Sequence, residues 1–337
     1  MHLDLTRRDL MKFAAGALAA GTVFPPSTRQ MSTAFAQTAN PTGTYYWVAH
    51  VGPGDPYWAV VQRGVQAVGK ALGVKAVFEG PAGYSPPKQA DMINSAISAK
   101  ASGIVTTSAD ASVIRGPIER AAKAGIPTIF SDTPPPDDFA GKFATGNPVS
   151  FVGVDIRPAA ARASAKLLPM LSKGDAVLVV NHEPGNRVLE LKTNGYIKGL
   201  ESLEPKVDKL VIGEETTKAV EIMRAYLEKH PDTKAILTLG TLGTHAVIKL
   251  LDETKTPNEK IRVVGSDVDD VTLEAIQRGR VVSTIDLQQF GMGFVPVVLL
   301  FLYNAYALDP NSYIGAGGTV DQKNVDTIIK LAKQGFR

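Results

Sequence analysis

The sequence predicts an α/β protein made of two similar units, each a parallel sheet flanked by helices. Short apolar runs alternate along the chain with longer segments whose apolar residues recur at helical spacing. This repeated strand–helix–strand order is typical of parallel sheets with helices on both faces. The alternation breaks at Pro134-Pro135-Pro136 and restarts near Phe151. A chain of 337 residues also has room for two domains of about 150 residues each.

The first unit begins with an apolar run at 45–51, which predicts a buried strand. A Gly-Pro-Gly turn at 52–54 ends this strand, and apolar residues at helical spacing up to Leu72 predict the first helix. The same patterns predict the other elements of this unit, with strands at 74–78, 103–107 and 126–130 and helices at 88–100 and 113–124.

The second unit begins with a predicted strand at 151–155. Apolar runs predict further strands at 176–180, 209–212, 235–239, 261–265 and 281–285. Amphipathic segments predict helices at 159–171, 188–203, 219–229, 244–251 and 271–277, followed by an apolar helix at 291–306 and an amphipathic one at 324–333. Two such units imply two lobes, and the cleft between two lobes is a favoured place for a ligand.

The amino-terminal segment has the pattern of an export signal. Arg7 and Arg8 precede a short apolar run at 13–24 and an Ala-Phe-Ala site at 34–36. The paired arginines are similar to the twin-arginine export pattern, and we expect cleavage after Ala36. The apolar run is about half of the roughly 20 residues that span a bilayer, which argues against a membrane anchor. We therefore expect a periplasmic protein.

Composition fits a soluble exported protein. Apolar residues make up 44% of the chain and charged residues 20%, which is enough to fill a globular core. The formal charge is +3, and because much of it lies in the export signal, nothing indicates a nucleic-acid surface. The chain has no cysteine, which excludes disulfides and thiol catalysis. A further apolar stretch at 294–302 is short and contains Pro296, so we expect no other membrane-spanning segment.

Catalytic and metal-binding patterns are missing from the sequence. The segment 64–71 approaches a phosphate-binding loop but ends in Ala71 and lies inside a predicted helix. No glycine-rich dinucleotide fingerprint follows a strand, no G-x-S-x-G turn occurs, and the histidines lack metal-ligand spacing. We therefore expect neither enzyme activity nor a cofactor or metal.

Polar residues do gather at the predicted ends of strands, at Asp55, Ser108, Asp132, Asp155 and Asp267. Ligands of open parallel sheets bind at that edge, outside the carboxyl ends of the strands. Carboxylates accept hydrogen bonds in pairs, as adjacent hydroxyls require, and the rings of Tyr57 and Trp58 suit the C–H faces of a sugar or polyol. The alternative is that each polar residue only caps a helix or shapes a turn.

An ordered series of short segments runs from Tyr45 to about Ile328. The segments are Asp55-Pro56-Tyr57-Trp58, 101–108, 125–132, 151–155, 195–200, 230–240, 263–267 and 279–286. In order and spacing they resemble the periplasmic solute-binding proteins of sugar ABC transporters, of the ribose-binding type. The resemblance implies the type I periplasmic binding protein fold, with two discontinuous lobes that are joined by three hinge strands and close over one small ligand.

The resemblance also implies lobe boundaries and a set of ligand-binding residues. The amino-terminal lobe is expected at 41–153 plus 288–313, and the carboxy-terminal lobe at 154–287 plus 314–337. The first lobe is expected to contribute Asp55, Tyr57, Trp58, Ser108 and Asp132. The second lobe and the hinges are expected to contribute Asp155, Lys192, Gly240 and Asp267.

The chain departs from the ribose binders at several of these positions. Thr133 and Lys192 stand where the ribose binders have arginines, which removes two bidentate forks. Other replacements are Gly240 for an asparagine, Leu287 for a glutamine and Glu214 for an aromatic residue. Gln288 is a candidate to serve in place of Leu287. His50 is a further candidate for ligand contact, the alternative being a buried structural histidine.

The function implied by the resemblance is that of a monomeric solute-binding component of a carbohydrate ABC importer. It would deliver a monosaccharide or a sugar alcohol to a membrane permease, and the autoinducer-2 signal is an open alternative ligand. A transcription regulator would need an amino-terminal helix-turn-helix where this chain has an export signal. An exported α/β hydrolase would need a nucleophile–base pair, and none is visible.

Overall fold

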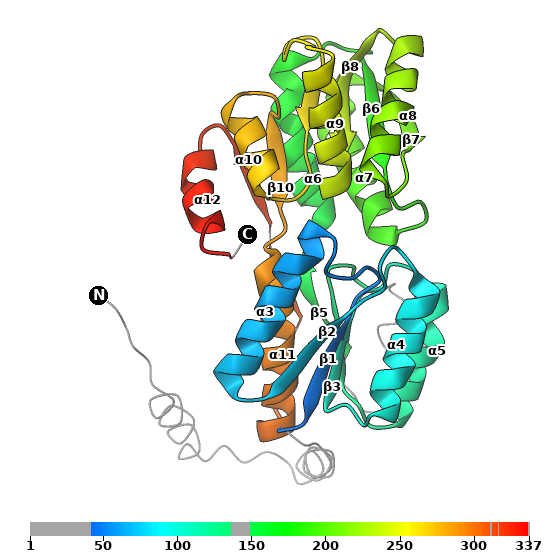
Figure 1. Cartoon of the computed structure of the whole chain (residues 1–337), viewed down its shortest axis with the longest axis vertical. Helices are drawn as coiled ribbons and strands as arrows, with labels where there is room; N and C mark the ends of the chain where they lie inside the picture. Colours follow the sequence, from blue (N-terminus) through cyan, green and yellow to red (C-terminus); the bar gives the residue numbers. More distant parts are fainter. Residues whose placement is uncertain (1–41, 136–148, 311, 316, 336–337) are drawn as a thin grey trace, which may run out of the picture.

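The computed structural model describes residues 42–135, 149–310, 312–315 and 317–335. The predicted export signal at 1–36 lies outside these residues. The described chain forms two six-stranded sheets, each flanked by helices, which occupy the lower and upper halves of Figure 1. The predicted α/β fold with two similar lobes is therefore confirmed.

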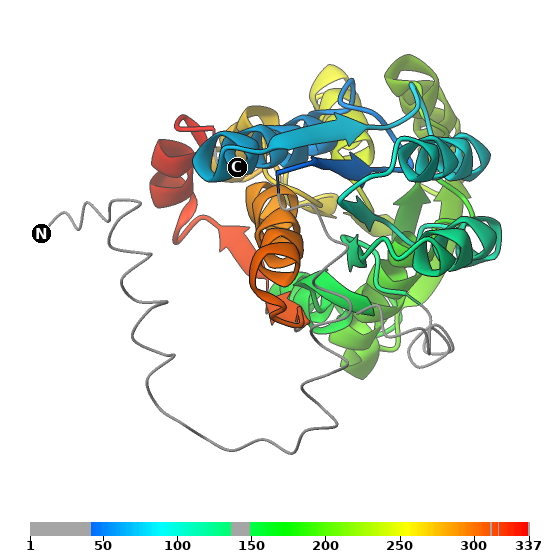
Figure 2. The ribbon, with the colours of Figure 1, turned by 90° about the horizontal axis from the view of Figure 1, so that it is seen from below.

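The first sheet has the strand order β11-β5-β4-β3-β1-β2, and all its strand pairs are parallel. Its strands are β1 Thr44–Val48, β2 Lys75–Glu79, β3 Gly103–Thr106, β4 Thr128–Ser131, β5 Val149–Val154 and β11 Tyr313–Gly315. Its helices are α3 Pro56–Leu72, α4 Pro86–Ser98, α5 Ala111–Lys123 and α11 Gln289–Tyr306. Helices α3 and α11 cover one face and α4 and α5 the other, each pair over its own apolar cluster (Figures 1 and 2).

The second sheet has the order β12-β10-β9-β8-β6-β7, parallel except for the antiparallel pair β10–β12. Its strands are β6 Ala176–Asn181, β7 Lys206–Val211, β8 Thr233–Thr238, β9 Arg262–Val264, β10 Ser283–Asp286 and β12 Gly318–Asp321. Its helices are α6 Ile156–Ser164, α7 Arg187–Leu200, α8 Thr216–Lys229, α9 Thr241–Glu253, α10 Asp270–Gln277 and α12 Val325–Ala332. Short 3-10 turns, η2 Ala165–Met170 and η3 Glu201–Leu203, follow α6 and α7.

The chain passes between the two sheets at three places. It leaves the first sheet after β5, returns between β10 and α11, and leaves again between β11 and β12. These crossings fit the three hinge strands that the resemblance implies. The residue boundaries of the two lobes stay a prediction.

Register places the carboxyl ends of neighbouring strands at one edge of each sheet. Val48 of β1 is paired with both Glu79 of β2 and Thr106 of β3. In the second sheet, Val180 of β6 is paired with Thr238 of β8. The loops that follow these strands face one another across the gap between the sheets (Figure 1).

Helix α11 is the one described helix that is long and apolar enough to cross a membrane by length and composition. The sequence predicts this apolar helix at 291–306 but no membrane span, because Pro296 lies in its apolar stretch. The helix continues through Pro296 and packs along α3. Gly64 of α3 and Gly293 of α11 permit this close approach, because a Cβ on either one would collide with the backbone of the other helix. Its buried face, with Val297 and Leu300, belongs to the apolar core of the first lobe.

Candidate ligand-binding site

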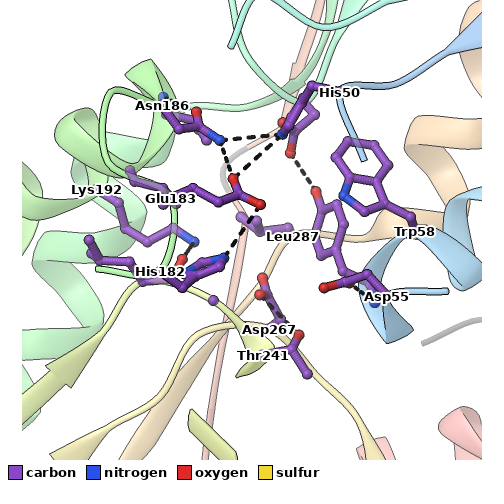
Figure 3. A pocket seen from close by; sticks show the side chains of 16 residues that line it. His50, Asp55, Trp58, His182, Glu183, Asn186, Lys192, Thr241, Asp267 and Leu287 are labelled. Atoms are coloured by element: carbon purple, nitrogen blue, oxygen red, sulfur yellow. Dashed lines mark hydrogen bonds and ion pairs between the residues drawn. The ribbon is translucent and has the colours of Figure 1, made fainter. Parts of the chain in front are cut away.

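A cavity of about 440 Å³, its open mouth included, lies between the carboxyl ends of the two sheets. Ligand sites often lie between two domains, as this cavity does. Both lobes contribute side chains, as Figure 3 shows. The lining residues are His50, Asp55, Tyr57, Trp58, Asp132, His182, Glu183, Asn186, Val188, Leu189, Lys192, Leu239, Gly240, Thr241, Asp267 and Leu287.

The first-lobe wall combines carboxylates with aromatic rings. Asp55 caps α3, its Oδ1 accepting a hydrogen bond of 2.8 Å from the Tyr57 amide, and the same side chain lines the cavity. The Tyr57 hydroxyl donates to Asp132 Oδ1 at 2.5 Å. The Trp58 ring lies edge-on to Tyr57, with 4.9 Å between ring centroids. Trp58 is part of the first-lobe core, so the surface it offers to a ligand is held rigidly.

Two of the carboxylates that line the cavity, one from each lobe, share an uncommon backbone conformation. Asp132 has φ 63° and Asp267 has φ 73°, in the left-handed region where most residues other than glycine are disfavoured. Asp132 directly follows β4, and Asp267 follows β9 by a few residues. Strain of this kind gathers at ligand sites, because the surrounding fold must hold it in place. Both carboxylates line the cavity.

The second-lobe wall is organised around Lys192. Its ammonium donates to the Leu239 carbonyl and to Ser266 Oγ, both at 2.6 Å, and the side chain is buried. Thr241 donates to Asp267 Oδ2 at 3.3 Å. Burial raises the pKa of Asp267 to about 6, although the positive charge of Lys192 lowers it in part. Burial likewise raises the pKa of Asp132.

A chain of polar contacts joins the lobes at one end of the cavity. His50 Nδ1 lies 2.7 Å from Thr107 Oγ1 in the first lobe, and its Nε2 lies 3.3 Å from Asn186 Nδ2 in the second. Asn186 also donates to Glu183 Oε2 at 2.6 Å. The Glu183 carboxyl is 3.8 Å from His50 and, on its other side, 3.8 Å from His182 (Figure 3). No group of three or more histidine, aspartate and glutamate side chains in the described part of the chain has the geometry to hold a metal ion.

Burial decides the protonation of this cluster. It lowers the pKa of both His50 and His182 to about 3, and it raises the pKa of Glu183 to about 8. At neutral pH the two imidazoles are therefore uncharged and Glu183 is mostly the neutral acid. The cavity holds three ionisable aspartates and one ammonium, Lys192, among its lining side chains.

Most of the predicted ligand-binding residues are brought together here. The structure places Asp55, Tyr57, Trp58, Asp132, Lys192, Gly240 and Asp267 in the cavity lining, together with the further candidate His50.

Three predicted residues are not in the lining. Ser108 is fully buried in the loop that follows β3. Asp155 is exposed at the start of α6. Gln288 is also exposed, and its φ of 59° directs the chain so that Leu287, and not Gln288, lines the cavity. Gln288 borders a separate hollow beside β5 and β11.

Sequence reasoning missed the residues after β6 that line the cavity, above all His182, Glu183 and Asn186. The pattern that could have identified them is a group of polar residues after a predicted strand, which is the pattern that predicts Asp55 and Asp132. Two residues at positions where the chain departs from the ribose binders make hydrogen bonds near the site. Thr133 donates to Asp132 Oδ2 at 2.8 Å, and Glu214 accepts a hydrogen bond of 2.9 Å from the Tyr84 amide.

Comparisons with known proteins agree with this architecture. Residues 46–304 match the family model described as "Periplasmic binding protein domain". The xylose/arabinose-binding protein XylF of Sulfolobus acidocaldarius is 23% identical over 270 residues, which cover 78% of this chain and 67% of that protein. Among solved structures, a periplasmic sugar-binding protein of an ABC sugar transporter from Legionella pneumophila is 28% identical, with a TM-score of 0.73 over 80% of this chain and 98% of that one. A carbohydrate transporter from Acidothermus cellulolyticus in complex with myo-inositol is 23% identical, with a TM-score of 0.76 over 87% and 99%.

Proposed function

Because this chain belongs to the periplasmic binding protein domain family, we propose that it is the solute-binding component of a carbohydrate ABC importer. The ligand is a monosaccharide or a cyclic or open polyol, which the protein binds in the cavity between the lobes and releases unchanged to a membrane permease. The named relatives that bind xylose, arabinose or other sugars support this ligand class.

The observation that carries the proposal is the composition of the cavity walls. Carboxylates from both lobes, Asp132 and Asp267, lie in one cavity with the rings of Tyr57 and Trp58. Hydroxyls of a sugar donate to carboxylates, and its C–H faces stack on aromatic rings. A ligand that contacts both walls binds the closed form better than the open form and so shifts the equilibrium toward closure.

The proposal includes export and a hinge. The twin-arginine pattern and the Ala-Phe-Ala site support delivery to the periplasm with cleavage near Ala36. The lobes, with the boundaries given above, move about the three crossings as a monomer. The ligand-binding residues are those predicted residues that line the cavity: Asp55, Tyr57, Trp58, Asp132, Lys192, Gly240 and Asp267.

Titration calorimetry on the protein without its export signal tests this function. The panel is D-xylose, L-arabinose, D-ribose, D-glucose, D-galactose, D-allose, myo-inositol and autoinducer-2. We expect at least one sugar or polyol to bind, and Asp132→Asn to weaken its binding by about tenfold or more, because a buried charged acceptor is lost. Asp232→Asn, at an exposed carboxyl before β8, is the matched control and should leave affinity unchanged.

Two results would contradict the proposal. One is the absence of binding by every sugar and polyol of the panel. The other is conversion of a bound sugar into a product, which would make the protein an enzyme.

A further inference from the structure

Position 240 needs a glycine because there is no room for a side chain, and not because of its backbone conformation. Its φ of −165° and ψ of 174° are extended values that any residue adopts. A Cβ at this position, however, would collide with Cε1 of the His182 ring and lie 2.8 Å from its Nε2. The imidazole thus occupies the space in which a side chain at 240 would stand.

His182 has two close neighbours in the cavity wall, Gly240 and Glu183. Gly240 lies against one edge of its ring, and the Glu183 carboxyl lies 3.8 Å from Nε2. The side chain is 11% exposed and lines the cavity (Figure 3). The ring therefore forms part of the second-lobe wall.

Two buried polar atoms of this wall have no hydrogen-bond partner among the described residues, His182 Nδ1 and Asp267 Oδ1. Thr241, which is next to Gly240, contacts the other oxygen of Asp267, so both atoms belong to one small region of the cavity wall. The Lys192 ammonium donates to Leu239 and Ser266, and it makes no hydrogen bond to either of these two atoms. A buried polar atom without a partner costs about 1–3 kcal/mol, which a ligand group recovers.

A hydroxyl is the group that fits both atoms. Asp267 as a carboxylate only accepts hydrogen bonds, whereas a neutral imidazole nitrogen donates or accepts according to its tautomer. A hydroxyl does both, whereas the carboxylate of a sugar acid or the phosphate of a sugar phosphate would face the Asp267 charge.

We propose that His182 is a ligand-contacting residue that, seated against Gly240, determines which neutral polyhydroxylated ligand the cavity accepts. This inference rests on the proposed function and adds to it a specificity-determining pair. His182 and Asp267 together take hydroxyl groups of the ligand, and sugar acids are excluded.

A double-mutant cycle tests the pair with the panel ligand that the unaltered protein binds best. Gly240→Ala, which displaces the ring, and His182→Ala, which removes it, should each weaken binding by about tenfold or more and change the order of preference within the panel. In the His182→Ala background the added methyl at 240 no longer meets a ring, so Gly240→Ala should then change affinity by less than about threefold. Gly243→Ala, in the same helix, adds a methyl at ordinary contact distance and should leave affinity unchanged.

Nitrogen-15 NMR of the imidazoles gives a second readout on the unaltered protein. Ligand should shift the ring resonances of His182 and leave those of His230, which stacks on Tyr226 at 4.2 Å outside the cavity, in place.

The outcomes separate the two proposals. If a panel ligand binds but His182→Ala keeps its affinity and its order of preference, or the His182 resonances do not move, the inference about His182 is overturned and the transport function stands. Tighter binding of D-glucuronate than of D-glucose also overturns it. If no sugar or polyol binds the unaltered protein, the proposed function falls and this inference falls with it.

Discussion

Glu183 is an acid that the fold keeps uncharged between two imidazoles. Burial is the main cause of its raised pKa; the hydrogen bond from Asn186 opposes the rise, and the neighbouring carboxyls Asp55, Glu214 and Asp132 add to it. A carboxyl whose pKa is higher in the folded protein than in the unfolded chain binds a proton on folding. Its contribution to stability is full below its ordinary pKa of 4.5 and is lost as the pH rises to about 8.

Replacing Glu183 by glutamine should therefore remove a pH-dependent loss of stability. Glutamine keeps the shape and the acceptor for Asn186 but does not ionise. We expect the free energy of unfolding of Glu183→Gln, relative to the unaltered protein, to rise steadily between pH 5 and pH 8. Urea denaturation followed by tryptophan fluorescence at pH 5, 6, 7 and 8 measures this difference. A difference that stays constant over this range would show that Glu183 ionises normally in the folded protein.

The acidic residues of the site could be predicted from the sequence because they lie at the ends of strands or in the loops that follow them. Asp55 and Asp132 come after apolar runs that are easy to recognise, and parallel topology brings such ends together. The choice between Leu287 and Gln288 could not be predicted, since it depends on the left-handed backbone at Gln288. The contact between His182 and Gly240 could not be predicted either, because the two residues lie in different loops, after β6 and after β8, and meet only in the folded structure.

At the scale of elements, strong periodicity made most strands and helices predictable, and β11 and β12 were missed. Both are short, Tyr313 and Ile314 of β11 are exposed, and no burial pattern marks them. Their place is set by partners far along the chain, β5 for β11 and β10 for β12. The predicted helix 159–171 also differs, because the chain tightens into η2, which contains Pro169.

Packing of α3 against α11 gives a prediction at this scale. Gly293→Ala places a methyl against the backbone carbonyl of Val61, which neither helix can avoid without moving. We expect a loss of about 1–3 kcal/mol in the free energy of unfolding, as for other overpacked cores. Gly291→Ala, two residues earlier in the same helix, meets no atom within 4 Å and should be neutral or stabilise by about 0.5–1 kcal/mol. Urea denaturation of both variants measures these changes. Equal changes in the free energy of unfolding would mean that the two helices can move apart at little cost.

For the whole molecule, closure depends on contacts that run from one lobe to the other at the rim of the cavity. The backbone amide of Arg187, at the start of α7, donates to the Ala109 carbonyl at 3.1 Å, and its guanidinium donates to the Pro134 carbonyl at 2.6 Å. On the same rim, Glu214 accepts from the Tyr84 amide. These bonds can form only when the lobes are together, so they stabilise the closed form without touching the ligand. Ligand affinity therefore depends on rim residues as well as on the cavity walls.

Arg187→Ala should consequently speed the release of ligand more than it slows binding. It removes a charged donor from the closed form and leaves the cavity lining unchanged, and a hydrogen bond of this kind contributes about 1.5–3 kcal/mol before screening by solvent. We expect the dissociation rate of the best panel ligand to rise by about threefold to tenfold, less than the full bond would give because the site is partly exposed. Stopped-flow fluorescence of Trp58, which lines the cavity, measures this rate.

Arg120→Ala is the matched control, since its guanidinium donates to Asn94 at 2.8 Å within the first lobe and makes no bond across the cleft among the described contacts. Equal dissociation rates in the two variants would mean that the rim opens and closes without help from Arg187, and that the walls of the cavity alone hold the lobes together.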